Sequence, residues 1–382
     1  MKILFITTDW NTPYRQTTNE YGGIGYYRAY MPAEALRDLG HDVDVLGADI
    51  RPHIDPNNLF GSYMKLFRPY EAIVFKQIDH KNAGIVLGAA KELKIPIAMD
   101  LDDNILEIGE SNQAYHRGYK KEGVKRAFAA ASLSMCDALF VTTEPLKKSY
   151  QKFLKDVLKK DMPTYILPNC CVPKHWNVET QVTKNMIIIG WHGSITHDED
   201  LKLVMPVINK LMKKYPNLYF QAMGGLLEDS AQKLFSVFDK EHHERLSVIK
   251  GTPSWKGFPE YLQSLSWDIG IAPLVDEEFT RGKSHIKWLE FSLKKIPCVA
   301  SRVYPYCEPI QGVETIKDGE TGFLASTPEE WEEKLSKLIE SNDLRRSMAK
   351  KARDFVMANW RYKHHAVKWE SALKKLIEMG GE

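Results

Sequence analysis

Short apolar runs alternate with amphipathic stretches along most of the chain. Runs that are rich in β-branched residues and too short for a helix indicate strands, and in the first half they cover residues 2–7, 42–46, 72–75, 95–99 and 138–141. Between them, apolar residues recur at helical spacing over residues 26–39, 83–93 and 120–135. Strands that alternate with helices predict a parallel sheet with helices on both faces.

The same order restarts near residue 186. Strands are predicted at residues 186–190, 218–223, 246–250, 268–272 and 297–301, with a helix at 201–214. The stretch 167–184 between the halves carries Pro168 and Pro173 and few periodic apolar positions, which is typical of a linker. We therefore predict an α/β fold of two Rossmann-like, doubly wound domains that face each other across a cleft.

The expected domain limits follow from this restart. The first domain is expected over residues 1–170, the linker over 171–185 and the second domain over 186–360. Residues 329–377 are almost entirely helical in pattern, and residues 361–382 are expected to be a C-terminal helix that can pack back on the first domain.

Composition narrows the class of protein. With 43% apolar and 27% charged residues the chain has material for real cores, and a formal charge of +2 lacks the basic excess of a nucleic-acid-binding protein. The apolar start is too short for a signal peptide, and no apolar run reaches the roughly 18 residues of a membrane span. Five cysteines without paired metal-ligand spacing suit reduced thiols. A cytoplasmic protein is expected.

A glycine-rich segment, residues 20–28 (EYGGIGYYR), precedes the first helix. Gly23 and Gly25 allow the backbone to approach a ligand, and Arg28 adds a charge near the positive end of the helix, so an anion site is one interpretation. A flexible loop is the other. A dinucleotide fingerprint is disfavoured because Arg28 occupies the third glycine position.

The densest signal is the segment 279–290 (FTRGKSHIKWLE), which follows a predicted strand. It holds the cations Arg281, Lys283 and Lys287, and Ser284 could cap the helix that follows. Lys283 and Lys287 are four residues apart and can face one phosphate group, while Glu290 could accept hydrogen bonds from ribose hydroxyls. The alternative is a solvated basic face with a surface salt bridge, but the apolar flanks favour a ligand site.

Two further loops carry polar residues. In the loop 190–200 (GWHGSITHDED), Gly190, Gly193 and Ser194 suit close approach to a phosphate, and His192 or His197 could donate to it. Consecutive acids on an emerging helix do not converge on a metal ion. The acids of residues 100–103 (DLDD) follow a predicted strand, where open α/β sheets place active sites. Asp102 and Asp103 are therefore candidate catalytic residues, with a helix N-cap as the alternative and a D-x-D metal site as another.

The stretch from Lys147 to Lys160 has six lysines and an apolar side. A solvated helix that covers its own domain is favoured, and a helix at a membrane surface, meeting a lipid-linked acceptor, is the alternative.

With these residues placed, the sequence resembles the group 1 glycosyltransferases of the GT-B fold, a retaining family that uses nucleotide sugars. The resemblance covers nearly the whole chain: residues 22–25 and 40–43 resemble the opening motif, residues 168–169 the end of the first domain, residues 188–194 and 197–201 the donor loop, and Glu290 with residues 297–301 the family signature. The family's second acid, eight positions before Glu290, is replaced by Gly282, and its usual Arg and Lys after the donor loop are not found.

The resemblance implies transfer of a sugar from a nucleoside diphosphate sugar, UDP- or GDP-linked, to a hydroxyl of a glycan or lipid-linked acceptor, with retention and without a metal or other cofactor. It implies donor contacts from the second domain. Our hypothesis adds a catalytic role for Asp102, Asp103 and Lys283. The expected donor-binding residues are Gly23, Gly25, Arg28, His192, Gly193, Ser194, Arg281, Lys283, Ser284, Lys287 and Glu290. Two other functions remain open, a sugar-nucleotide epimerase on the same fold and a two-lobed small-molecule binding protein. The expected location is the cytoplasm, with peripheral contact at the inner membrane face through residues 147–160 as an extension.

Overall fold

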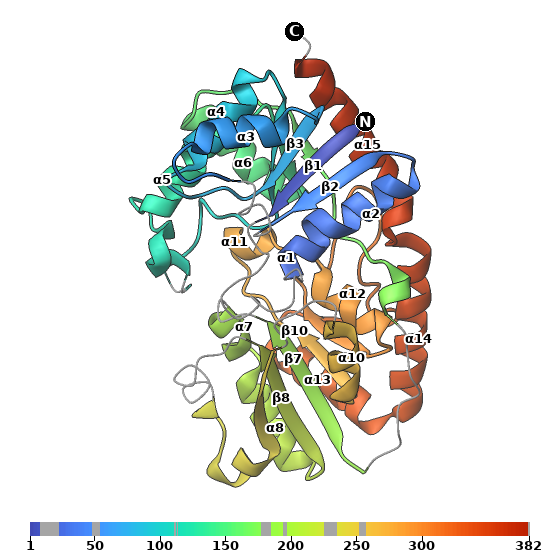
Figure 1. The fold of residues 1–382 in the computed structure, drawn as a ribbon. Coiled ribbons are helices and arrows are strands. Elements are labelled where there is room, and N and C mark those ends of the chain that lie inside the picture. Colours follow the sequence, from blue (N-terminus) through green and yellow to red (C-terminus); the bar gives the residue numbers. More distant parts are fainter. Residues whose placement is uncertain are drawn as a thin grey trace.

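The computed structural model describes residues 1–7, 23–47, 54–110, 112, 114–176, 185–193, 197–224, 235–251 and 257–380. Two parallel six-stranded sheets, one in each half of the chain, form two domains that lie one above the other in Figure 1. The predicted α/β fold of two doubly wound domains is confirmed.

The first sheet has the strand order β2-β1-β3-β4-β5-β6, with every neighbouring pair parallel. Ile3 of β1 lies opposite Val43 on one side and Ala72 on the other, so β1 is an interior strand, and its Ile3, Leu4 and Phe5 are buried. The elements of this domain are β1 (Lys2–Thr7), α1 (Gly23–Gly25), η1 (Tyr26–Tyr30), α2 (Met31–Asp38), β2 (Asp42–Leu46), α3 (Leu59–Phe67), β3 (Ala72–Lys76), α4 (Ala83–Glu92), β4 (Ile97–Leu101), η3 (Tyr115–Tyr119), α5 (Val124–Met135), β5 (Ala138–Val141), α6 (Glu144–Asp156) and β6 (Thr164–Ile166).

The second sheet has the order β12-β11-β10-β7-β8-β9, again with parallel neighbours. A Cβ atom on Gly190 of β7 would lie 1.8 Å from the Trp267 ring, so glycine lets this indole pack directly on the strand. The elements are η4 (Pro173–His175), β7 (Ile187–Gly193), α7 (Asp198–Lys202), α8 (Met205–Lys214), β8 (Leu218–Gly224), η6 (Lys240–Arg245), β9 (Leu246–Lys250), α10 (Phe258–Ser264), β10 (Ile269–Ala272), α11 (Glu278–Arg281), α12 (Ile286–Leu293), β11 (Cys298–Ser301), β12 (Phe323–Ala325), α13 (Pro328–Glu340), α14 (Asn342–Asn359) and α15 (Tyr362–Gly380).

The end of the chain returns to the first domain. Where α14 gives way to α15, Cys171 pairs with Arg361 as in a parallel ladder, and the amide of Tyr362 donates to the Cys171 carbonyl at 3.0 Å. The helix α15 then packs against α2 and runs beside the first sheet (Figure 1). Its buried Trp369, Leu373 and Leu376 belong to one apolar core with β1.

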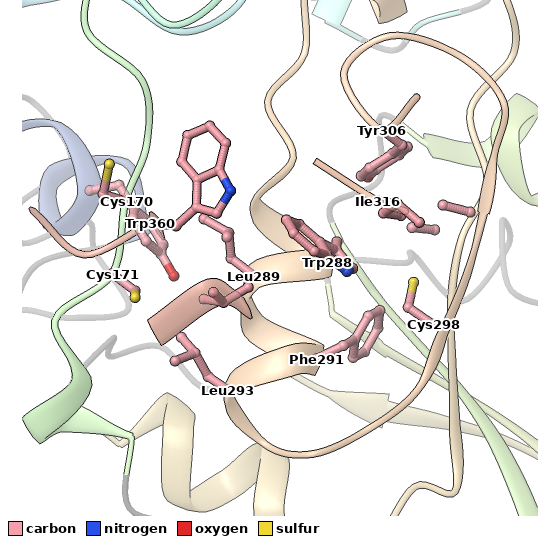
Figure 2. Packing of buried hydrophobic residues seen from close by; sticks show 14 of the residues in the cluster. Cys170, Cys171, Trp288, Leu289, Phe291, Leu293, Cys298, Tyr306, Ile316 and Trp360 are labelled. Atoms are coloured by element: carbon pink, nitrogen blue, oxygen red, sulfur yellow. The ribbon is translucent and has the colours of Figure 1, made fainter. Parts of the chain in front are cut away.

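A second apolar core crosses between the domains. It contains Tyr26 and Tyr27 of η1 together with residues of the second domain. Figure 2 shows Trp288, Leu289 and Leu293 of α12 in this core, with Cys170 and Cys171 and Trp360 nearby. The domains therefore share apolar contacts in addition to their polar ones.

The structure differs from the predicted elements at several places. The structure has two helices, α7 and α8, where one was predicted at 201–214. Pro206, in the first turn of α8, has no backbone N–H to donate to a preceding turn, so a helix can start there but α7 cannot continue through it. The strands β6 and β12 are only three residues long, and the sequence pattern did not reveal them. The predicted linker falls partly on residues 177–184, which lie outside the described residues.

The lysine-rich stretch 147–160 lies largely on α6. Leu146, Tyr150, Phe153 and Leu154 of this helix are buried against their own domain. Across the ranges that the structure describes, no helix combines the length and the apolar character that crossing a membrane requires.

We expect Trp369→Ala to lower the free energy of unfolding by about 3–5 kcal/mol, because it empties the contact between α15 and the first sheet. Urea unfolding followed by far-UV circular dichroism measures this change. Val367→Ala on the same helix, where the side chain is 55% exposed, is the control and should change the stability by less than about 0.5 kcal/mol. Equal effects of the two substitutions would contradict the packing of α15 described above.

Candidate functional site

The carboxyl ends of the two sheets meet at the boundary between the domains. Lys283 Nζ, in the loop before α12, lies 2.9 Å from Asp103 Oδ1, just beyond β4. Asn169, beyond β6, donates to Ser284 Oγ at 3.0 Å, and the Thr143 hydroxyl, beyond β5, donates to the Gly282 carbonyl at 3.2 Å. Open α/β sheets bind ligands at these strand ends, so this junction is the candidate site.

Each acid of the predicted DLDD motif has a cation of its own. Both oxygens of Asp100 accept from Arg28, at 2.9 and 2.5 Å, and Asp102 Oδ1 lies 2.6 Å from Lys76 Nζ. Burial alone would raise the pKa of Asp102, but the charge and hydrogen bond of Lys76, together with the charges of Arg28 and Lys283, outweigh it and the pKa is lowered. Asp103 is the member of the motif that faces the second domain, through Lys283.

Arg28 is fully buried inside the first domain. Besides Asp100, its guanidinium donates to the Leu167 carbonyl at 2.6 Å and to Asn169 Oδ1 at 3.1 Å, and it lies 5.1 Å from the Trp369 ring. Burial alone would lower the pKa of Arg28. The charge and hydrogen bonds of Asp100, together with smaller contributions from Tyr362 and Asp102, outweigh burial and raise this pKa. The predicted donor role for Arg28 therefore has no geometric support, because its donors are used within the domain. Gly23 and Gly25 form the short turn α1 before it.

Glu290 in α12 lies close to residues of both domains. Tyr27 of η1 donates its hydroxyl to Glu290 Oε1 at 3.1 Å, and His192 Nε2, at the end of β7, lies 3.2 Å from Oε2. Burial raises the pKa of Glu290 to about 8, while the Tyr27 hydroxyl and Lys287 act in the opposite direction. Burial and the nearby Lys287 lower the pKa of His192, so its imidazole is neutral near pH 7.

Lys287, one turn before Glu290, is also buried. Its Nζ lies 3.3 Å from His197 Nε2, and the other ring nitrogen of His197, Nδ1, lies 2.6 Å from Asp200 Oδ2. Burial is the main reason why the pKa of Lys287 is lowered to about 8, with a further decrease from Lys283. A buried ammonium beside a neutral imidazole can bind an anionic oxygen.

Some predicted donor residues differ from the expectation in their partners or in their role. Arg281 is 55% exposed and pairs with Asp276 through both oxygens, at 2.6 and 2.9 Å. Ser284 does not cap a helix, because α12 begins at Ile286 with His285 in the N-cap position and no side-chain cap. Gly193 ends β7 beside His197, and Ser194 lies outside the described residues.

Several residues of the junction were not predicted. Tyr27 and Lys76 gave no local signal, since their partners Glu290 and Asp102 lie far along the sequence. The pair His197 and Asp200 did carry one: an imidazole and a carboxylate three residues apart can meet within a single helical turn.

A separate cluster at η6 has metal-ligating residue types. Its members are Asp239, Glu241 and His242, the one such group among the described residues. Asp239 is paired with Lys213 at 2.8 Å, and His242 Nδ1 lies 2.7 Å from Asn209 Oδ1. These partners already satisfy the cluster, and no metal site is assigned to it.

We expect the stability gained by Glu290→Gln to grow with pH. Because burial raises the pKa of Glu290 from 4.5 to about 8, the folded protein binds a proton that the unfolded chain releases, and the wild type loses stability as the pH rises between these values. Glutamine mimics the protonated acid, so the variant should gain at least about 1 kcal/mol on the wild type between pH 5 and pH 8.5.

Urea unfolding at both pH values measures the difference. Glu320→Gln, at an exposed glutamate, is the control. If the difference in stability between Glu290→Gln and the wild type does not change with pH, the conclusion that burial raises the pKa of Glu290 is contradicted.

Comparisons with known proteins bear on both domains. Residues 258–371, which include Lys283, Lys287 and Glu290, match a family model described as glycosyl transferase-like. Among curated proteins the sequence has no match.

Solved structures match over almost the whole chain. They include a sucrose-phosphate synthase from Thermosynechococcus elongatus (14% identity, TM-score 0.65, 99% of this chain and 100% of that one), HepE from Anabaena in complex with UDP-glucose (14%, 0.66, 98% and 100%) and a glycosyltransferase from Rickettsia africae (14%, 0.64, 98% and 98%). The chain therefore has the two-domain GT-B fold of these glycosyltransferases, with a glycosyl transferase-like sequence in its second domain.

Proposed function

We propose that this protein is a glycosyltransferase that moves a sugar from a nucleoside diphosphate sugar to a hydroxyl of a glycan or lipid-linked acceptor. The donor is UDP- or GDP-linked. Structural neighbours with UDP or UDP-glucose bound support a nucleotide-sugar donor. The two-lobed binding protein is less well supported, because the segment that matches the family model supplies the charged residues of the junction.

One observation carries this proposal: the second domain presents Lys283, Lys287 and Glu290 together at the carboxyl ends of both sheets. One ammonium group in the loop before α12 and one in the first turn of this helix suit a diphosphate, and the carboxyl group of Glu290 one turn further suits vicinal ribose hydroxyls. In the protein described here Tyr27 holds Glu290 Oε1, so a ribose takes the place of the Tyr27 hydroxyl when it binds.

The arrangement suits the chemistry of sugar transfer. The bond from the anomeric carbon to the diphosphate breaks, and negative charge grows on the leaving oxygen beside Lys283 and Lys287. Cations that are fixed before the reaction stabilise that charge without reorganising. The acceptor hydroxyl attacks on the face that the diphosphate leaves, so its oxygen bonds to the anomeric carbon with retention and its proton passes to the departing diphosphate. No protein nucleophile is required.

Asp102 and Asp103 are proposed to act on the acceptor. Asp103 bonds to Lys283 across the junction, so a group that orients the acceptor lies beside a group that binds the donor. Asp102 is held by Lys76, which fixes its carboxylate at the end of β4. Contact of α6 with a membrane surface remains a proposal that rests on its exposed Lys148, Lys152 and Lys155.

The proposed reaction is independent of metal ions. The acids that could form a D-x-D site are each paired with a cation, Asp100 with Arg28 and Asp102 with Lys76, and Lys283 and Lys287 supply the positive charge that a diphosphate requires. No other cofactor enters the proposal.

We expect Lys283→Ala to lower kcat/KM for the donor by about tenfold to a hundredfold, since a charge-assisted contact to the leaving group is worth about 1.5–3 kcal/mol. A screen of UDP, GDP and ADP sugars by thermal shift identifies the donor, and chromatography of the products with and without acceptor measures transfer. Isomerised donor in the absence of an acceptor would identify an epimerase instead.

Lys213→Ala is the matched control for this substitution. Lys213 is an exposed lysine of the second domain that pairs with Asp239, away from the junction. Arg281→Ala should cost less than Lys283→Ala because its guanidinium is bound to Asp276. Normal turnover by Lys283→Ala would exclude Lys283 from the diphosphate site.

We expect activity to persist in EDTA. The lysines, not a divalent ion, are proposed to neutralise the diphosphate. The rate of transfer is compared before and after dialysis against EDTA and again after Mg²⁺ is added. Complete loss that Mg²⁺ reverses would contradict metal independence and favour a D-x-D site.

A further inference from the structure

We propose that His197 and Asp200 are positioning residues that hold the Lys287 ammonium in place for a diphosphate oxygen of the donor. This inference rests on the proposed function. It adds two residues that make no contact with the donor themselves and act through Lys287.

The three side chains form a continuous line of contacts. The Val275 amide, beyond β10, donates to Asp200 Oδ1 at 2.7 Å, which fixes the carboxylate. The other oxygen, Oδ2, lies 2.6 Å from His197 Nδ1, and His197 Nε2 lies 3.3 Å from Lys287 Nζ. All three side chains are buried.

The direction of the hydrogen bonds follows from chemistry. A carboxylate only accepts, so the proton of the neutral imidazole lies on Nδ1, toward Asp200. The lone pair of Nε2 then faces the ammonium of Lys287, which donates to it. Burial, together with Lys287 and Lys283, lowers the pKa of His197, which keeps the imidazole neutral and able to accept.

Lys287 has hydrogen-bonding capacity left over. An ammonium has three donors, and His197 takes one of them. No carboxylate lies within 4.0 Å of Lys287 Nζ in the part of the chain that the structure describes, whereas Lys283 is paired with Asp103. A buried cation whose one close partner is a neutral ring retains its charge for an anionic ligand.

The backbone supports this arrangement. A Cβ atom on Gly193 would lie 2.5 Å from the Trp191 ring and 3.3 Å from His197 Cδ2, so glycine lets the imidazole lie close to the end of β7. The Trp191 ring lies 6.0 Å from Lys287 Nζ and closes one side of the ammonium. The position of His197 is thus determined by packing as well as by Asp200.

Charged and titratable groups from several elements surround Lys287 and affect its pKa. Its charged and titratable neighbours are Lys283 from the preceding loop, Asp200 and His197 from α7 and its N-cap, Glu290 from α12, Asp103 beyond β4, His192 from β7 and Cys298 from β11. Burial lowers the pKa of Lys287 to about 8, so the ammonium is charged at pH 7 and is lost as the pH rises through 8.

A double-mutant cycle tests the positioning role. UDP, GDP and ADP are titrated by calorimetry at pH 7, and the one that binds the wild type is used throughout. Lys287→Ala should weaken its affinity by about tenfold to a hundredfold, and His197→Asn and Asp200→Asn by about tenfold each. In the Lys287→Ala background, His197→Asn should have no further effect, because its influence passes through Lys287.

The pH profile supplies a readout that lost packing would not change. Wild-type affinity should fall above pH 8. In the wild type the Asp200 carboxylate raises the pKa of Lys287. Asp200→Asn removes this effect, so the affinity of the variant should begin to fall at a lower pH. Lys287→Arg should show no such fall below about pH 10, since a guanidinium stays protonated.

His242→Asn is the control, since His242 is another buried histidine that bonds to Asn209 at η6. It should leave affinity and pH profile unchanged, and thermal unfolding of each variant by circular dichroism confirms that it is folded.

The outcomes separate the two proposals. If the wild type binds none of the nucleotides, or Lys287→Ala binds as tightly as the wild type, the proposed function fails. If Lys287→Ala weakens binding but His197→Asn weakens it equally in both backgrounds, or Asp200→Asn keeps the wild-type pH profile, only the positioning role is overturned.

Discussion

The guanidinium of Arg28 connects segments that lie far apart along the chain. Its partners Asp100, Leu167 and Asn169 are 72, 139 and 141 positions away, and the Trp369 ring of α15 packs over it. Removing one partner of a buried ion pair costs about 3–5 kcal/mol, since the other charge is left without compensation. This one group fixes the relative positions of four parts of the chain: η1, the end of β4, the segment that leaves the first sheet after β6, and the C-terminal helix.

The same interaction governs the junction. Asn169 accepts from Arg28 and donates to Ser284, so the loop that carries Lys283 is one hydrogen bond away from the core of the first domain. Asp100 in turn sets the place of β4, at whose end Asp102 and Asp103 lie. A change at Arg28 would therefore disturb the site although Arg28 takes no part in the proposed chemistry.

The architecture was predictable because its signals are local. Apolar runs and helical spacing identified β1 and most other strands and helices, since a buried parallel strand requires a continuous apolar run. The edge strand β2, which is only partly buried, was recognised by its alternation of polar and apolar residues. The strands β6 and β12 were not predicted because three residues are too few for a periodic pattern. Pro206 was the available sign that the helix predicted at 201–214 would be interrupted.

The site was predicted less completely. The sequence identified Lys283, Lys287, Glu290 and Asp103 by their composition and position after strands, and the structure brings them to one junction. It could not show that Arg28 turns inward to Asp100, or that Arg281 bonds to Asp276, because charge and spacing are the same for a ligand site and for an internal pair. Long-range partners decided between these alternatives, and no local pattern reports them.

The hydroxyl of Tyr27 has a consequence for any ribose that binds Glu290. Tyr27 belongs to the chain, so it competes for the carboxylate at a fixed effective concentration that dilution does not reduce. Under the proposed function, the measured affinity for a donor is the intrinsic affinity lowered by the fraction of molecules in which Tyr27 has released Glu290. Tyr362 of α15 donates to the carbonyl of Tyr27, so the C-terminal helix takes part in setting that fraction. The strength of donor binding is thus coupled to a helix that approaches from the opposite end of the sequence.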